Sequence, residues 1–144
     1  MAMVKKLLKA AKKGDVTAQY NLGVAFSKGV DVQADHEKGF RWFLEAARKG
    51  HPKAMNNLGL IYARGLGVAR DEEKAVKWFK RAAEHGNSKA QKNLGIMFKM
   101  GRGVEKDYTK AAECFMEAAS QGHDSAKWAL RMMGEKAIGL AMRE

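Results

Sequence analysis

The chain has few of the residues that cross-link or interrupt a fold. Cys114 is the one cysteine and Pro52 the one proline among 144 residues. A single cysteine excludes an intramolecular disulfide, so the sequence gives no support to an oxidising compartment. No apolar run approaches the roughly 20 residues that cross a bilayer, and residues 4–9 lack the unbroken apolar stretch of a secretory signal. We therefore expect a cytoplasmic protein without a transmembrane segment.

The sequence also lacks the patterns of common catalytic and metal sites. Cys114 has no partner at metal-ligand spacing. No Ser-x-x-Lys, no Gly-x-Ser-x-Gly and no phosphate-binding glycine-rich loop occurs. We expect no catalytic residues, no metal and no cofactor, and hence a protein that is not an enzyme.

Acidic residues are missing from the N-terminal segment. Residues 1–13 hold five lysines and no acid, and the whole chain carries a net charge of +11. A basic protein favours acidic proteins, nucleic acid or anionic membranes as partners. Lys5 to Lys13, together with Leu7 and Leu8, form one candidate surface for an anionic membrane. The alternative is that these lysines lie on solvated helix faces and serve solubility.

What the chain does have is a repeat of 36 residues. Leu22, Leu58, Leu94 and Leu130 share one phase, and a glycine follows each of the first three. A fixed period of this size indicates supersecondary units stacked side by side. Such a stack presents an extended surface for binding.

The middle unit reads as two helices joined by a glycine-rich turn. The first helix is expected over about 52–64, with His51 as N-cap, and Gly65 ends it in the left-handed conformation. Gly59 in mid-helix costs about 1 kcal/mol against alanine, which indicates close approach of another helix. Asp71 caps the second helix. Asp15 and Asn87 hold the His51 position in the neighbouring units, and Asp35 and Asp107 hold the Asp71 position.

The predicted fold is all-α, a right-handed α/α solenoid of about three full helix-pair repeats with partial capping units at both ends. We expect a single domain in which residues 1–13 form a capping helix. Repeats follow at 14–49, 50–85 and 86–121, and residues 122–144 form a partial repeat with a C-terminal cap. Trp42 and Trp78 share a phase and are expected in the core, whereas Trp128 is a candidate for the binding face.

The repeated residues resemble the Sel1-like repeat, a relative of the tetratricopeptide repeat with a longer unit. The residues that carry the resemblance in the middle unit are Ala54, Leu58, Gly59, Tyr62, Gly65, Gly67, Val68, Asp71, Lys74, Ala75, Trp78, Phe79, Ala82, Ala83 and Gly86. The resemblance implies a non-enzymatic protein–protein interaction module that acts as an adaptor or scaffold. The family also has a cysteine-rich secreted branch, from which this chain departs with its single cysteine.

In related repeats the first helix of each pair lines a concave groove. Transferring that phase predicts a groove with an aliphatic floor that becomes more basic toward the third unit. Its expected lining is Thr17, Tyr20, Asn21, Val24, Lys28, Lys53, Asn56, Asn57, Leu60, Arg64, Lys89, Lys92, Asn93, Ile96 and Lys99. Asparagine side chains hold extended backbones, and lysine and arginine pair with carboxylates. We expect an acidic or carboxylate-ended protein segment as the partner. The alternative for the three repeated asparagines, Asn21, Asn57 and Asn93, is a bond to a neighbouring helix.

Three alternatives stay open at this point. A specific inhibitor, such as an immunity protein for a bacterial effector, would use the same concave face as an adaptor. Nucleic-acid binding is suggested by the net charge, although the groove offers few aromatic residues for base stacking. The oligomeric state is also open, because Met132, Met133 and Met142 make the tail apolar enough to support a dimer.

Overall fold

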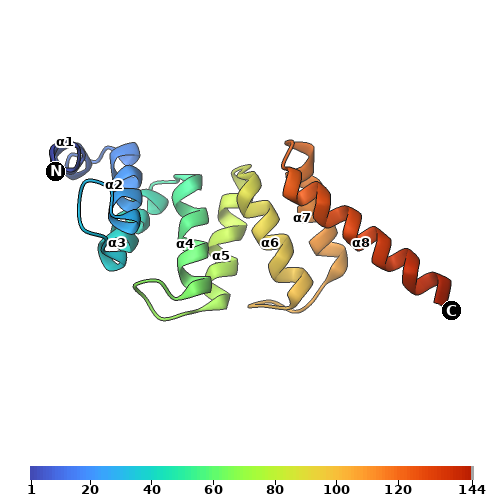
Figure 1. Cartoon of the computed structure of the whole chain (residues 1–144). Coiled ribbons are helices and arrows are strands. Elements are labelled where there is room, and N and C mark those ends of the chain that lie inside the picture. The colour runs from blue at the N-terminus through green and yellow to red at the C-terminus, as the bar shows by residue number, and fades with distance from the viewer. Residues whose placement is uncertain (144) are drawn as a thin grey trace.

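The computed structural model describes the backbone of residues 1–143 and the side chains of residues 1–135. Within these residues the chain forms eight helices and no strand. The helices follow one another along a single axis, with the two termini at opposite ends (Figure 1). They are α1 (Ala2–Lys12), α2 (Val16–Lys28), α3 (His36–Arg48), α4 (Pro52–Arg64), α5 (Glu72–Glu84), α6 (Ser88–Met100), α7 (Tyr108–Ser120) and α8 (Asp124–Arg143).

Three antiparallel pairs, α2–α3, α4–α5 and α6–α7, form the body of the stack, and each helix packs mainly against its neighbours along the chain. This is the arrangement expected of a solenoid, in which contacts are local and each unit buries the face of the next. The predicted all-α solenoid is confirmed. The predicted residue boundaries of the repeats stay a prediction.

The helix ends follow the predicted capping residues. The side chains of Asp15, His51 and Asn87 accept hydrogen bonds from backbone N–H groups three residues later, at the starts of α2, α4 and α6. Asp35, Asp71 and Asp107 do the same for α3, α5 and α7. Gly65 ends α4 with φ 70°, a conformation that suits a residue without Cβ.

Close packing within each pair explains the glycine in mid-helix. A Cβ at Gly59 of α4 would overlap the ring of Phe79 on α5, and one at Gly95 would lie 2.7 Å from a ring carbon of Phe115. Both rings are almost fully buried. The aromatic side chain of the second helix therefore lies directly on the backbone of the first.

The turn between the helices of one pair also contacts the preceding pair. Gly67 lies so close to the backbone of His36 and Glu37 that a Cβ would come within 2.7 Å of it. Asp31 holds the same phase, and it is the one non-glycine residue with positive φ within residues 1–143. Its carboxylate accepts a hydrogen bond of 3.0 Å from the N–H of Val4 and pairs with the N-terminal amine. Asp31 thus caps α1 from another part of the chain, and the amine holds its pKa below the usual range.

Two of the three tryptophans and the apolar side of α1 pack against the interior. Trp42 and Trp78 are partly buried and pack against the core, as predicted. Trp128 on α8 is 65% exposed. Leu7 and Leu8 of α1 pack against the N-terminal part of the core, so the apolar residues that a membrane would need already have contacts within the stack.

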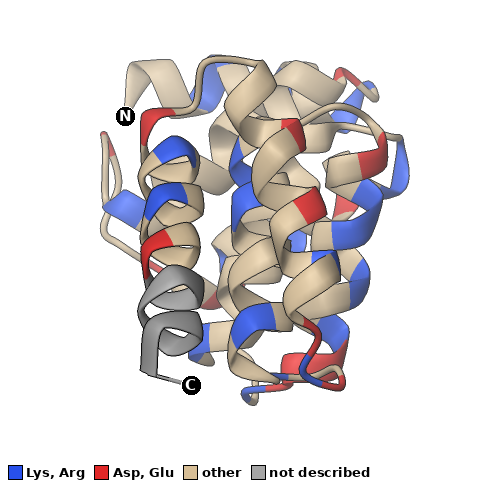
Figure 2. Ribbon diagram, turned by 90° about the vertical axis from the view of Figure 1, so that its right-hand side faces the viewer, with Lys and Arg blue, Asp and Glu red and all other residues tan. Residues whose placement is uncertain are grey.

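Lysines and arginines are spread around the stack. The view along its axis shows them on most helices, intermixed with aspartates and glutamates (Figure 2). Met132 is 37% exposed, whereas the side chain of Met142 lies outside the described residues, and so do those of Ile138 and Leu140.

Candidate functional site

The first helices of the first two pairs enclose a hollow of about 370 Å³, named here the α2–α4 cavity. Its walls come from α2 and α4, with contributions from the turns, from α3 and from the start of α6. The lining residues are Tyr20, Val24, Ser27, Lys28, His36, Phe43, Asn57, Leu60, Ile61, Arg64, Leu66 and Lys89. Seven of the predicted groove residues meet here: Tyr20, Val24, Lys28, Asn57, Leu60, Arg64 and Lys89.

The charged side chains that line this cavity are all positive. Lys28, Arg64 and Lys89 supply three cations from three different repeats, and no acidic side chain is among the lining residues. Val24 and Leu60 are partly buried and pack against the core, so they form an apolar floor. A site of this kind attracts a carboxylate to its rim and an aliphatic group to its floor.

A second hollow of about 410 Å³ adjoins the first and shares Tyr20 with it. It is lined by Thr17, Tyr20, Asn21, His51, Pro52, Lys53, His85, Gly86 and Asn87. The Tyr20 ring stacks on the His51 imidazole with centroids 4.6 Å apart. Burial, with a smaller contribution from Lys53, lowers the pKa of His51. The imidazole is thus held neutral, as its role of accepting the Ala54 N–H through Nδ1 requires.

Asn56 and Asn93 hold the stack together. Asn56 is 4% exposed, and its Oδ1 accepts a hydrogen bond of 3.0 Å from Nδ2 of Asn93. This bond joins α4 to α6, so of the three repeated asparagines Asn93 bonds a neighbouring helix. Asn57 instead lines the α2–α4 cavity, and Asn21 is exposed and lines the second hollow.

The third repeat contributes less to the cavity than the sequence suggested. Lys89 is its one lining residue, whereas Lys92, Ile96 and Lys99 are half-buried and absent from the lining. Five residues that the sequence did not predict also line it: Ser27, His36, Phe43, Ile61 and Leu66. His36 and Leu66 flank or lie in the turns between helices, and transferring the phase of the first helix could not reach them.

The described residues do not assemble a metal site or a reactive thiol. They contain no group of three or more histidine, cysteine, aspartate or glutamate side chains that could hold a metal. Burial raises the pKa of Cys114 to about 11, with help from Glu117 and Glu113, so its thiol is unreactive at neutral pH. No helix in the described part of the chain is long and apolar enough to span a membrane.

Taken together, the helix pairs and the hollow along their first helices define an α/α solenoid of the kind that binds other proteins. Three consecutive segments, residues 16–51, 52–87 and 88–123, match the Sel1 repeat. The chain therefore belongs to the Sel1 repeat family, as its repeated residues predicted. Proteins of this family generally mediate protein–protein interactions.

Solved structures show the same fold. A Sel1 repeat protein from Oxalobacter formigenes is 32% identical with a TM-score of 0.89, over 93% of this chain and 53% of that one. The protective antigen c5321 of uropathogenic Escherichia coli is 32% identical with a TM-score of 0.88, over 94% and 29%. Cysteine rich protein B of Helicobacter pylori is 25% identical with a TM-score of 0.71, over 88% and 96%.

The chain thus spans about half of the Oxalobacter protein and less than a third of the Escherichia coli antigen. None of the curated proteins matches the chain.

Proposed function

We propose that this protein is a non-enzymatic interaction module that holds an acidic or carboxylate-ended segment of another protein in the α2–α4 cavity. The lining of that cavity carries the proposal, because three cations surround an apolar floor and no acid competes for them. Membership of a family that generally mediates protein contacts supports the same function. An adaptor and a specific inhibitor would both use the cavity in this way.

Each part of the cavity has a role in this proposal. Arg64 and Lys89 pair with carboxylates of the segment, and arginine can do so with two parallel hydrogen bonds. Asn57 bonds the backbone of the segment through its amide, which both donates and accepts. Val24 and Leu60 take an aliphatic side chain.

Nucleic acid suits the cavity less well. Proteins that bind single strands stack successive bases on exposed aromatic rings. Tyr20 is one of two aromatic residues in the lining, and its ring already stacks on His51. The other, Phe43, is 3% exposed.

Selection from a peptide library tests the proposal. Random eight-residue peptides are displayed with free C-terminal carboxylates and selected on the full chain. We expect the selected peptides to be rich in aspartate and glutamate. Calorimetry should show the best of them binding at least tenfold more weakly to the double variant Arg64→Glu, Lys89→Glu, since two attractive contacts become repulsive.

The matched control is the double variant Lys77→Glu, Lys127→Glu, which changes the net charge equally at exposed positions outside the cavity lining. Binding to the control should stay within about twofold at 0.15 M salt, because distant charges are screened there. Equal losses of affinity in the two double variants would show that binding depends on net charge alone, which would contradict the proposal. So would selected peptides without acidic residues.

A further inference from the structure

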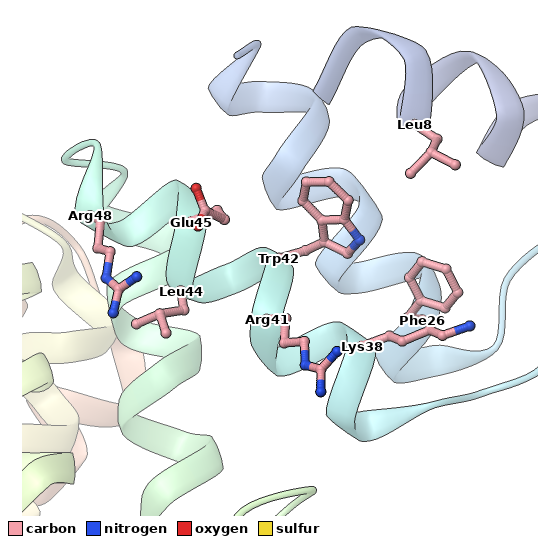
Figure 3. Close-up of a pocket in the computed structure, with 8 residues that line it drawn as sticks. All are labelled: Leu8, Phe26, Lys38, Arg41, Trp42, Leu44, Glu45 and Arg48. Atoms are coloured by element: carbon pink, nitrogen blue, oxygen red, sulfur yellow. The ribbon is translucent and has the colours of Figure 1, made fainter. Parts of the chain in front are cut away.

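A separate hollow of about 560 Å³ lies between α1 and α3, and we name it the α1–α3 hollow. Leu8, Phe26 and Trp42 come from α1, α2 and α3 and surround one space, with Lys38 and Arg41 along its edge (Figure 3). None of these residues lines the α2–α4 cavity. The volume lies within the range of about 300–1,000 Å³ that is typical of binding pockets.

Trp42 differs from its counterpart one repeat later. Trp78 has the guanidinium of Arg81 at 5.0 Å from its ring centroid, in a cation–π contact that covers one face of the ring. The residue three positions after Trp42 is Glu45, which cannot make this contact. Among the described residues, no cation lies over the Trp42 ring. Its ring therefore lines the hollow without a charged group over it.

The rim of the hollow carries an excess of positive charge. Lys38, Arg41 and Arg48 line it together with one acid, Glu45. Arg41 also pairs with Glu37 at 3.1 Å, but both side chains are more than half exposed, with 71% and 65% accessible. Exposed pairs of this kind contribute little, so a partner's carboxylate can replace Glu37 at small cost.

The neighbouring helix adds to this charge. Lys5 and Lys12 lie three residues before and four residues after Leu8, which places them on the same face of α1. Both are exposed, and residues 1–13 contain no acid. The apolar space is thus bordered by cations on both helices.

We propose that the α1–α3 hollow is a second docking site, which takes an acidic peptide segment of a partner protein. The segment inserts one large apolar side chain between Leu8, Phe26 and Trp42, and its flanking carboxylates pair with Arg41 and Lys38. The site is independent of the α2–α4 cavity, so it allows the chain to hold two segments at once. With both sites occupied, the solenoid would link two partner segments.

Charge and shape together select this occupant. A flat membrane surface would need apolar side chains along an outer face of α1, whereas Leu8 lies with Phe26 and Trp42 around a hollow between helices. A nucleic acid strand would need a row of open aromatic rings, and the lining of the hollow offers two, Phe26 and Trp42. An acidic peptide with one apolar anchor meets both the rim and the floor.

The test is a selection on the full chain. Random twelve-residue peptides are displayed within a carrier protein, so that they have no free C-terminal carboxylate. We expect an enriched class with one phenylalanine, tryptophan or leucine flanked by acidic residues. Calorimetry with a synthetic, amidated member of that class should show at least a tenfold loss for Arg41→Glu. The variant Arg64→Glu, Lys89→Glu should bind it within about twofold at 0.15 M salt, which separates this site from the α2–α4 cavity.

Glu45→Arg distinguishes docking from simple charge attraction. This variant gains two positive charges, so binding driven by charge alone would become tighter. Our proposal predicts at least fivefold weaker binding, because the new guanidinium would cover Trp42 as Arg81 covers Trp78. Helicity and thermal midpoint identical to the parent chain show that each variant is folded.

Four results would overturn the proposal. The first is that the selection enriches no acidic peptide with an apolar anchor, and the second is that Glu45→Arg binds the peptide as tightly as the parent chain or more tightly. The third is an equal loss of affinity in Arg41→Glu and in Arg64→Glu, Lys89→Glu. The fourth is that the chain self-associates through Trp42 and binds no peptide there.

Discussion

The complete helix pairs and the last helix, α8, follow the same register but differ where a second helix would pack. In the pair α4–α5, Gly59 lies against the Phe79 ring with no room for a Cβ. Arg131 holds the phase of Gly59 in α8, and its side chain is exposed. Gly134 replaces the aromatic residue at the phase of Tyr62. Within the described residues, α8 therefore lacks the glycine against which the aromatic ring of a second helix packs in the pair α4–α5.

The starts of these helices differ as well. Nδ1 of His51 accepts the N–H of Ala54 at the start of α4. His123 holds the same phase before α8, and its buried Nδ1 has no hydrogen-bond partner among the described residues. The register of the repeat alone therefore does not produce a complete helix pair. Each of the three complete pairs also has the mid-helix glycine, the aromatic ring against it and a side-chain cap.

The largest effect is expected from Gly59→Ala. Although alanine favours helix over glycine by about 1 kcal/mol, the new methyl group would overlap the Phe79 ring. We expect a net loss of about 3 kcal/mol in the free energy of unfolding, at the upper end for overpacking. Urea denaturation followed by circular dichroism measures it. A loss below 0.5 kcal/mol would show that α4 and α5 can separate without cost, contrary to this account.

Asn93→Ala should have the next largest effect. The substitution leaves the buried Oδ1 of Asn56 without its donor, and an unpaired buried polar atom costs about 2 kcal/mol. The matched control is Asn21→Ala, at the same phase but exposed, which should change stability by less than about 0.5 kcal/mol. In α8 this phase is held by Ala129. Equal effects at the two asparagines would refute the packing role.

Gly134→Ala is expected to stabilise the chain, in contrast to Gly59→Ala. This glycine also lies in mid-helix, yet nothing lies within 4 Å of the position of its Cβ. Only the helix preference of alanine remains, so we expect a gain of about 0.5–1 kcal/mol. The same denaturation measurement applies. A loss would mean that α8 packs against something at Gly134 after all.

The smallest effect concerns pH. The pKa of His51 is lowered in the folded chain, so the unfolded chain binds the proton first as pH falls through about 6.5. The stability contributed by neutral His51 is therefore complete above that pH and declines below it. His51→Asn keeps a capping acceptor and removes the titration. The difference in unfolding free energy between pH 7.5 and 5.5 should shrink in this variant, and an unchanged difference would refute the assignment.

Much of the fold could be predicted because its determinants are local. Asp15, His51 and Asp71 lie at fixed spacing before apolar faces, and a capping side chain bonds a backbone group three residues away. Gly59 was informative because a glycine in mid-helix has a cost that only close packing offsets.

What sequence could not supply are contacts between units. The cap that Asp31 provides for Val4 spans 27 residues, and the bond between Asn56 and Asn93 spans 37. Their geometry depends on the rise and rotation from one pair to the next, which a periodic sequence does not encode visibly. The same parameters decide that Lys89 lines the cavity whereas Lys92 does not.

The central claim is that the α2–α4 cavity holds an acidic segment of a partner. The most direct measurement is the amide NMR spectrum of the full chain during titration with the best peptide from the free-carboxylate selection. The account predicts that the largest shifts fall at Lys28, Asn57, Arg64 and Lys89, and that they vanish in Arg64→Glu, Lys89→Glu. Shifts spread evenly over exposed lysines, or confined to α7 and α8, would contradict it.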